Sequence, residues 1–301
     1  MSYIQESNME LTTNITLEML KESIEKHTVL CANALIYEKD KGLHFNLNGI
    51  SAFMPFDDVV YSPDGKTPKE ATVITRVNKK VCFTVTDILT DEKNTTVIIS
   101  RKAVQKNYYE YFIKKLVPGD VIECAATHID TFGVFCDIGY GITALLPINF
   151  ISVSRINSPR DRFQPGQNLY ACIKSIDSSG RIVLTHKELL GSWMENAQLF
   201  RPMTTAVGVV RSIEDYGIFI ELMPNLAGLA EICPGVEVGD VVNVYIKSIL
   251  PDKMKVKLVI MSVLDENEFT NDIKYFITDG HIDYWRYSTD SNIKNVYTDF
   301  Q

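Results

Sequence analysis

Two stretches of the sequence repeat one pattern of apolar runs, acids, aromatic residues and glycines. The first reads VIECAATHIDTFGVFCDIGYGITALLPINFIS at residues 121–152, and the second reads AVGVVRSIEDYGIFIELMPNLAGLAE at residues 206–231. In each, an alternating run leads to Ile, an acid and one aromatic residue before Gly. The stretches that follow, 168–190 and 241–264, share the run IKSI. Such repetition indicates a chain built from copies of one supersecondary unit.

A fainter copy of the pattern lies upstream, at residues 29–55 and 79–105. In all copies, short apolar runs alternate with turn signals, which is typical of β-sandwiches or barrels and not of strand–helix units. We therefore predict a mainly β protein of three tandem five-stranded barrels, with short linking helices and a degenerate first module. The predicted segments are an N-terminal segment with a helix (1–28), the degenerate module (29–105), a linking helix (106–116), the second module (117–191), a second linking helix (192–203), the third module (204–264) and a tail (265–301).

The two ends of the chain differ from the modules. Residues 1–13 are polar, and we expect them to be loose, whereas Thr16 can cap a helix that runs to Lys26. The tail is acidic but carries large aromatic residues on both sides of Thr278-Asp279-Gly280. Asp-Gly favours a tight turn, so we predict a hairpin there. Because so many apolar groups would not stay solvated, we expect the tail to dock on the third module.

The overall charge, taken as a sum, argues against nucleic-acid binding. The formal net charge is −8 and the pI is about 5.2, whereas neutralising phosphates requires Lys and Arg. Residues 192–301 hold 16 acidic against 9 basic residues, so most of the negative excess lies in the C-terminal third. The middle of the chain is nearly neutral, which leaves nucleic-acid binding open there.

Six cysteines are present, with no CxxC spacing and no His pair at metal-ligand spacing near them. We therefore expect free core thiols in a reducing compartment, with no metal and no cofactor. The N-terminus lacks the basic and then apolar pattern of a signal peptide, and no apolar run is long enough to span a membrane. These features favour the cytoplasm and give no indication of a membrane partner.

Two aromatic residues of the second module could form a stacking platform for bases. A five-stranded barrel with exposed second and third strands offers such a surface, and single-stranded nucleic acid needs aromatic faces for bases and cations for phosphates. Phe132 and Phe135 flank Gly133, and strict alternation would put the two rings on opposite faces. A Gly at the start of the strand permits a bulge or twist that brings both to one face. The alternative is that Phe135 faces the core.

Basic residues of the same module could hold the phosphates. Arg155, Arg160 and Arg162 lie in a Pro-containing loop after the third predicted strand, where they could clamp a backbone as charge-assisted donors. The alternative is a solvated loop with local ion pairs. Lys174 and Arg181 lie on or near the last two strands of the module.

No motif points to catalysis. The sequence holds no Gly-x-Ser-x-Gly, no phosphate-cradling Gly loop and no metal-ligand constellation. A lone residue such as His186 is more often a surface residue than an acid–base catalyst. We therefore expect a protein that is not an enzyme.

The second module resembles the S-one RNA-binding domain family. The resemblance rests on PGDVIECAATHIDTFGVFCDIGYGITALLP, followed by PGQNLYACIKSID and GRIVLTHKELL. The third module carries EDYGIF, NLAGLAE and VGDVVNVYIKSI. The overall arrangement is similar to that of three-module ribosomal-S-one-like proteins of Gram-positive anaerobic bacteria. The resemblance implies that the barrels have the OB fold, and it is strong over residues 115–262.

In that family a shallow site uses two aromatics of the second strand, a His after the third strand, and an Asp and a basic residue around the turn between the last two strands. For the second module, the resemblance implies Phe132, Phe135, Asp177 and Arg181 as the RNA-binding residues. Pro147 stands at the His position, so one contact of the family pattern is missing.

The other two modules depart further from the family pattern. In the third module the resemblance implies Tyr216, Phe219 and Lys255, but Glu231 stands at the His position and would repel phosphate. In the first module His44 stands roughly at the position of the second aromatic, without an aromatic partner in the sequence pattern. We therefore expect the first module to be mainly structural or protein-facing.

Together the residues and the resemblance favour an mRNA-binding or ribosome-associated translation protein. It would bind single-stranded RNA through its second module and associate with the small ribosomal subunit. One alternative is an OB-fold scaffold for protein interactions with little RNA affinity, which the acidic C-terminal third, Pro147 and Glu231 favour. Another is an accessory subunit of an RNA-processing complex. The sequence indicates no oligomeric state.

Overall fold

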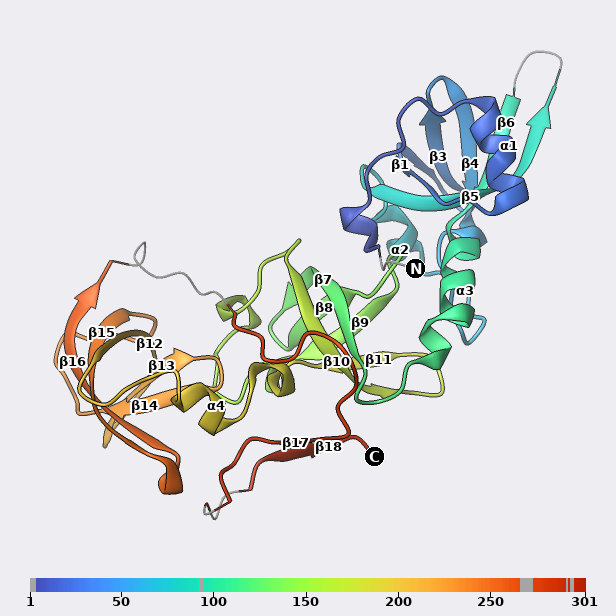
Figure 1. Ribbon diagram of the computed structural model, residues 1–301. Coiled ribbons are helices and arrows are strands. Elements are labelled where there is room, and N and C mark those ends of the chain that lie inside the picture. Colours follow the sequence, from blue (N-terminus) through green and yellow to red (C-terminus); the bar gives the residue numbers. More distant parts are fainter. Residues whose placement is uncertain (1–3, 92–94, 266–272, 291, 293–294) are drawn as a thin grey trace. The chain divides into compact units, whose positions relative to one another are not determined.

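A computed structural model describes residues 4–91, 95–265, 273–290, 292 and 295–301. The chain divides into two compact units. The first unit comprises residues 1–116 together with 137–144 and 177–181, and the second comprises 117–136, 145–176 and 182–301. The chain as a whole is built mainly of β-strands, as the sequence predicts (Figure 1).

The first module is a curled six-stranded sheet with the order β1-β5-β6-β4-β3-β2. Ala34 donates its backbone N–H to the carbonyl of Lys79, whereas Leu35 donates to the carbonyl of His44. The chain therefore changes partner between Ala34 and Leu35, which splits the first strand in two and leaves the sheet of the described residues open. The strands are β1 (Leu30–Asn33), β2 (Ile36–Glu38), β3 (Gly42–Leu47), β4 (Ile50–Pro55), β5 (Lys80–Thr90) and β6 (Thr95–Ser100).

Helices surround this sheet. The predicted N-terminal helix is confirmed as α1 (Leu17–Lys26), because the hydroxyl of Thr16 accepts the backbone N–H of Met19 at 3.3 Å. The helix ends at His27, whose φ of 53° is left-handed. The other helical segments of this region are η1 (Glu6–Asn8), η2 (Phe56–Asp58), α2 (Glu70–Ile74), α3 (Arg101–Tyr111) and η3 (Ile113–Lys115).

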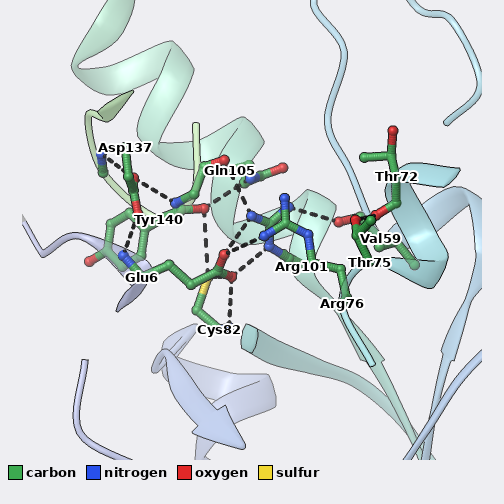
Figure 2. Close-up of polar contacts among 12 residues, drawn as sticks. Glu6, Val59, Thr72, Thr75, Arg76, Cys82, Arg101, Gln105, Asp137 and Tyr140 are labelled. Carbon is green, nitrogen blue, oxygen red and sulfur yellow. Dashed lines mark hydrogen bonds and ion pairs between the residues drawn. The ribbon is translucent and has the colours of Figure 1, made fainter. Parts of the chain in front are cut away.

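The described part of the N-terminal segment is not loose, because Gln5 and Glu6 are buried. The Glu6 carboxylate accepts Nε and Nη2 of Arg101 at 2.6 and 2.7 Å and the backbone N–H of Cys82 at 3.0 Å (Figure 2). Asp137 in turn accepts the backbone N–H of Glu6 at 2.7 Å. Burial raises the pKa of Glu6, but the Arg101 guanidinium outweighs it and holds that pKa below its ordinary value. The buried Glu6 carboxylate, paired with Arg101, therefore anchors the N-terminal segment. The polar composition of the segment did not indicate this.

The second module is a closed barrel with the strand order β10-β11-β9-β8-β7, and the third is a closed barrel with the order β12-β13-β14-β16-β15. Both orders are those of a five-stranded OB barrel, as predicted. The second-module elements are β7 (Val121–Asp130), β8 (Gly133–Asp137), β9 (Thr143–Pro147), η4 (Ile148–Phe150), η5 (Pro159–Asp161), β10 (Asn168–Ile176) and β11 (Ile182–Thr185). The third-module elements are β12 (Thr205–Glu214), β13 (Gly217–Met223), β14 (Leu226–Ala230), β15 (Val241–Leu250), η7 (Pro251–Lys253) and β16 (Lys255–Leu264).

One glycine recurs at the start of the second strand of each module. A Cβ on Gly133 or Gly217 would lie 2.5 Å from a carbonyl oxygen of the third strand, and one on Gly42 would lie 2.0 Å from such an oxygen. Gly at this position therefore allows two backbones to approach closely. The first module therefore shares this close backbone approach with the other two.

The predicted second linking helix is shorter than the range 192–203. A turn of 3₁₀ helix, η6 (Lys187–Leu190), and the short helix α4 (Trp193–Ala197) stand on either side of Gly191. The φ of Gly191 is 76°, which interrupts helical geometry between them.

The tail does not form the predicted hairpin at 278–280. Its only strands in the described residues are β17 (Tyr284–Arg286) and β18 (Tyr297–Asp299), which pair antiparallel. The backbone around Gly280 is bonded to the second module instead: Val121 donates to the carbonyl of Gly280, and Ile282 donates to that of Gly119. Long-range bonds have thus replaced the local turn.

The tail packs on the second module as well as on the third. Trp285 and Tyr287 are buried in one apolar cluster with Leu189 of the second module and Leu222 and Leu258 of the third. The prediction of docking on the third module alone was therefore incomplete.

The six cysteines are all free, as predicted. Five of them are buried, and Cys233 is partly exposed. In the part of the chain that the structure describes, no helix has the length and apolar character needed to cross a bilayer.

Candidate nucleic-acid interface

The two aromatic rings of the second module lie together on its surface. Phe132 sits in the turn before β8 and is 49% exposed, and Phe135 on β8 is half-buried. Their ring centroids are 5.8 Å apart and the planes are perpendicular, at 90°. Because Phe132 precedes the strand, the alternation of β8 does not separate the rings.

A third ring, which the sequence analysis did not single out, belongs to His128 on β7. The imidazole is exposed, and its centroid lies 5.9 Å from that of Phe135 with the planes 28° apart. The hydroxyl of the neighbouring Thr127 donates to the carbonyl of Phe135 at 3.0 Å, which ties β7 to β8 here. The signal that could have revealed His128 is its place on the strand next to the aromatic pair, five residues before Gly133.

The third module repeats the aromatic pair. Tyr216 is 68% exposed and its ring lies 6.0 Å from that of Phe219, again at 90°. Glu231, which follows β14, and Lys255, the first residue of β16, are both exposed.

The first module does have a partner for His44. The rings of His44 and Phe53 lie 5.0 Å apart and 49° inclined, because the two residues are opposite each other on β3 and β4. Glu38 binds Nε2 of His44 at 3.0 Å, so an acid adjoins this pair. Our expectation that His44 has no aromatic partner was therefore wrong, because the repeat pattern does not show which residue lies opposite it on the neighbouring strand.

The three arginines of the loop after β9 differ in their exposure to solvent. Arg155 and Arg160 are exposed, and Nη2 of Arg160 donates to the carbonyl of Ile129 on β7 at 3.4 Å. The side chain of Arg162 is fully buried and donates to the carboxylate of Glu221 on β13. Arg162 is thus directed into the protein and away from the surface where phosphate contacts were expected.

Glu221 also pairs with a second arginine. Nε and Nη2 of Arg211 lie 3.1 and 3.3 Å from its two carboxylate oxygens. Arg211 also lies 3.7 Å from Asp161. Two guanidinium groups around one buried carboxylate thus join the loop after β9 to the third module.

The turn between β10 and β11 presents one cation to solvent. The carboxylate of Asp177 accepts the backbone N–H groups of Ser179 and Arg181 at 2.8 and 2.9 Å. Bonds from Ser179 first, and from Arg181, lower the pKa of Asp177. The Arg181 side chain is 80% exposed. Asp177 therefore shapes the turn on which Arg181 stands.

Lys174 is occupied by the tail. Its Nζ lies 5.1 Å from the ring centroid of Phe300. This is a cation–π contact, and it directs the Lys174 ammonium toward the tail.

His186 is buried, contrary to the expectation of a surface residue. Its Nδ1 lies 2.7 Å from the carbonyl of Ile151 and its Nε2 lies 3.1 Å from the hydroxyl of Tyr275. A carbonyl only accepts, so Nδ1 carries the proton of the neutral ring and Nε2 accepts from Tyr275. Burial lowers the pKa of His186 to about 4. Its role is to join the tail to the second module.

Within the described ranges, no three His, Cys, Asp or Glu side chains come together in a group able to hold a metal ion. The residues of the candidate interface are aromatic rings and exposed arginines.

The strand orders define two OB-type barrels, and each carries a pair of aromatic rings on its second strand or the turn before it. Residues 115–187 match the model of the S1 RNA binding domain, the S-one family named above. This match confirms the resemblance of the second module to that family.

The chain also resembles ribosomal proteins, and it spans about half the length of the curated relatives it matches. Small ribosomal subunit protein bS1 of Staphylococcus aureus (strain COL) is 32% identical over 195 residues, which cover 59% of this chain and 50% of the relative. The bS1 protein of Leuconostoc lactis is 29% identical over 245 residues, covering 75% and 54%. A crystal structure of a multidomain protein with nucleic acid binding domains from Streptococcus pneumoniae is 14% identical, with a TM-score of 0.26, over 78% of this chain and 73% of that one.

Proposed function

We propose that this protein binds single-stranded RNA, with the second module as the principal site. The observation that carries the proposal is the aromatic pair of exposed Phe132 and half-buried Phe135, within the residues that match the S1 RNA binding domain. Bases would stack on the rings, and phosphates would contact Arg155, Arg160 and Arg181, whose side chains are exposed. The protein would have no catalytic step of its own.

Two of the predicted cations have a smaller part in this proposal. Arg162 is buried against Glu221, and Lys174 lies over Phe300. We therefore assign Arg162 to the fold and treat Lys174 as a secondary contact. In the third module, Tyr216, Phe219 and Lys255 would form a weaker site, because Glu231 adds a negative charge.

The partners follow by likeness to the relatives, which are named as proteins of the small ribosomal subunit. We infer that the RNA is mRNA and that the protein associates with that subunit in the cytoplasm. Co-sedimentation of purified protein with small subunits at several salt concentrations tests the association.

Replacing Phe132 and Phe135 together by Ala should weaken RNA binding by at least about tenfold, because each stacked base contributes about 1–3 kcal/mol. The measurement is fluorescence anisotropy of a labelled single-stranded RNA of about 20 nucleotides. Binding by the unaltered protein should weaken linearly with log salt concentration, with a slope of about 0.7 per neutralised phosphate.

The matched control is Tyr216→Ala with Phe219→Ala, which removes the same pair from the third module. This control should have the smaller effect. An unaltered protein that shows no saturable binding at about 50 mM salt would overturn the proposal and favour the protein-interaction scaffold.

A further inference from the structure

His128 continues the stacking surface of the second module toward β7. Its ring plane is only 28° from that of Phe135, whereas the Phe132 plane is perpendicular to Phe135. A base stacks face to face on a ring whose plane is parallel to its own. The surface thus has three rings: His128 and Phe135 are nearly parallel, and Phe132 stands at a right angle to Phe135.

A cation stands next to the imidazole end of this platform. Arg160 donates to the carbonyl of Ile129, the residue that follows His128 along β7. The Ile129 side chain is buried, while the side chains of His128 and Arg160 are exposed. A base on His128 would therefore have an exposed guanidinium close by for its phosphate.

The third module has no such extension. Counting back five residues from the glycine that begins the second strand leads to His128 in the second module and to Ser212 in the third. The stretch between them has the same length in both modules, HIDTFG and SIEDYG. The third-module platform therefore ends at Phe219.

We propose that His128 is an RNA-stacking residue and that, with Arg160, it gives the second module a binding place for one more nucleotide than the third. This inference rests on the proposed RNA-binding function. The family pattern places a His after the third strand, where this chain has Pro147, whereas His128 supplies a ring from the first strand. The ligand is a run of at least three unpaired nucleotides over Phe132, Phe135 and His128.

The test compares His128→Ala, His128→Phe and Ser212→Ala in the full chain, using a labelled 20-nucleotide oligouridylate. His128→Ala should weaken binding by between about fivefold and 100-fold, without changing the salt slope, because no phosphate contact is lost. His128→Phe should retain affinity within about twofold, because a ring remains for stacking. Ser212→Ala is the matched control and should leave affinity unchanged.

Arg160→Gln separates the phosphate contact from the stacking contact. It should reduce the salt slope by about 0.7, the value for one phosphate of a single strand. Thermal unfolding of every variant verifies the fold, and the exposure of His128 and Arg160 predicts intact stability.

The outcomes separate the two proposals. If the unaltered protein fails to bind the oligouridylate, the proposed function itself fails. If it binds and Phe132→Ala with Phe135→Ala weakens binding, but His128→Ala leaves the affinity unchanged within about twofold, the extension toward β7 is overturned. Equal losses for His128→Ala and His128→Phe would also overturn it, because the contact would then need the imidazole nitrogens and not a stacked ring.

Discussion

Several charged side chains of this protein are buried and paired with opposite charges, and Arg162 is one of them. In the sequence, Arg155, Arg160 and Arg162 form one basic loop, yet only the first two are exposed. The third, Arg162, pairs with Glu221, which follows it by 59 positions in the sequence and lies on another module. The sequence could indicate a basic loop, but it could not show which of the three arginines pairs with an acidic residue of the next barrel.

The pair predicts a large stability effect. Glu221→Gln would leave Arg162 buried without its counter-charge, and breaking a buried ion pair from one side costs about 3–5 kcal/mol. The double variant Glu221→Gln with Arg162→Met should be less destabilised than the sum of the two single variants. Urea denaturation followed by tryptophan fluorescence measures the three free energies of unfolding.

An exposed pair provides the control. Glu22 and Lys26 lie on α1 with side chains 52% and 66% exposed, and Glu22→Gln should change stability very little because such pairs are screened by water. Equal effects at Glu22 and Glu221 would contradict the assignment of Arg162 to the core.

His186 predicts a pH dependence of stability. Burial lowers its pKa in the folded protein to about 4, below the ordinary value of 6.5, so the folded state holds the neutral ring. The contribution to stability is complete above pH 6.5 and is lost as the pH falls toward 4, by up to about 3 kcal/mol at 1.36 kcal/mol per unit. Denaturant unfolding across pH 4–7 measures it.

The comparison variant is His186→Asn, whose amide can replace Nδ1 as donor to Ile151 but does not titrate. The variant should lose this component of the pH dependence. Comparing the two proteins also cancels Asp137, whose pKa is raised by burial to about 6 and which therefore acts in the opposite direction. Parallel pH curves for the two proteins would show that His186 is not the source.

Within single helices and strands, local sequence signals predicted local structure and little else. The α1 helix was predictable because its cap, Thr16, and its apolar positions lie within one short segment. The tail hairpin failed because the chain around Gly280 bonds to residues 119 and 121, far away in sequence. A turn signal gives a local preference, and a distant backbone can overrule it.

The tail strand β17 gives a test of that docking. Trp285 is 7% exposed and its neighbour Tyr284 is 51% exposed, because alternate residues of a strand face opposite sides. Trp285→Ala should lower the free energy of unfolding by about 3–5 kcal/mol, and Tyr284→Ala should change it far less. Thermal denaturation by circular dichroism measures both. Equal losses from the two substitutions would mean that the tail does not pack as described.

The repeated strand pattern of the sequence predicted the architecture of the three modules. Three copies of one strand pattern correspond to two closed barrels and one curled sheet. Each copy has a glycine where the second and third strands approach closely. The opening of the first sheet was beyond sequence reasoning, since it depends on a change of partner between Ala34 and Leu35. Phe132 and Phe135 could be predicted as a pair from their motif. His128 could not, because it reaches the pair from a different strand.

The free cysteines have a practical consequence for experiments on this protein. Of the six thiols, five are buried and Cys233 alone is partly exposed. A maleimide dye added to the folded protein should therefore attach first at Cys233, without any engineered site. Reaction of the other five would report on unfolding, so the same reagent can label the native protein and time the exposure of its core.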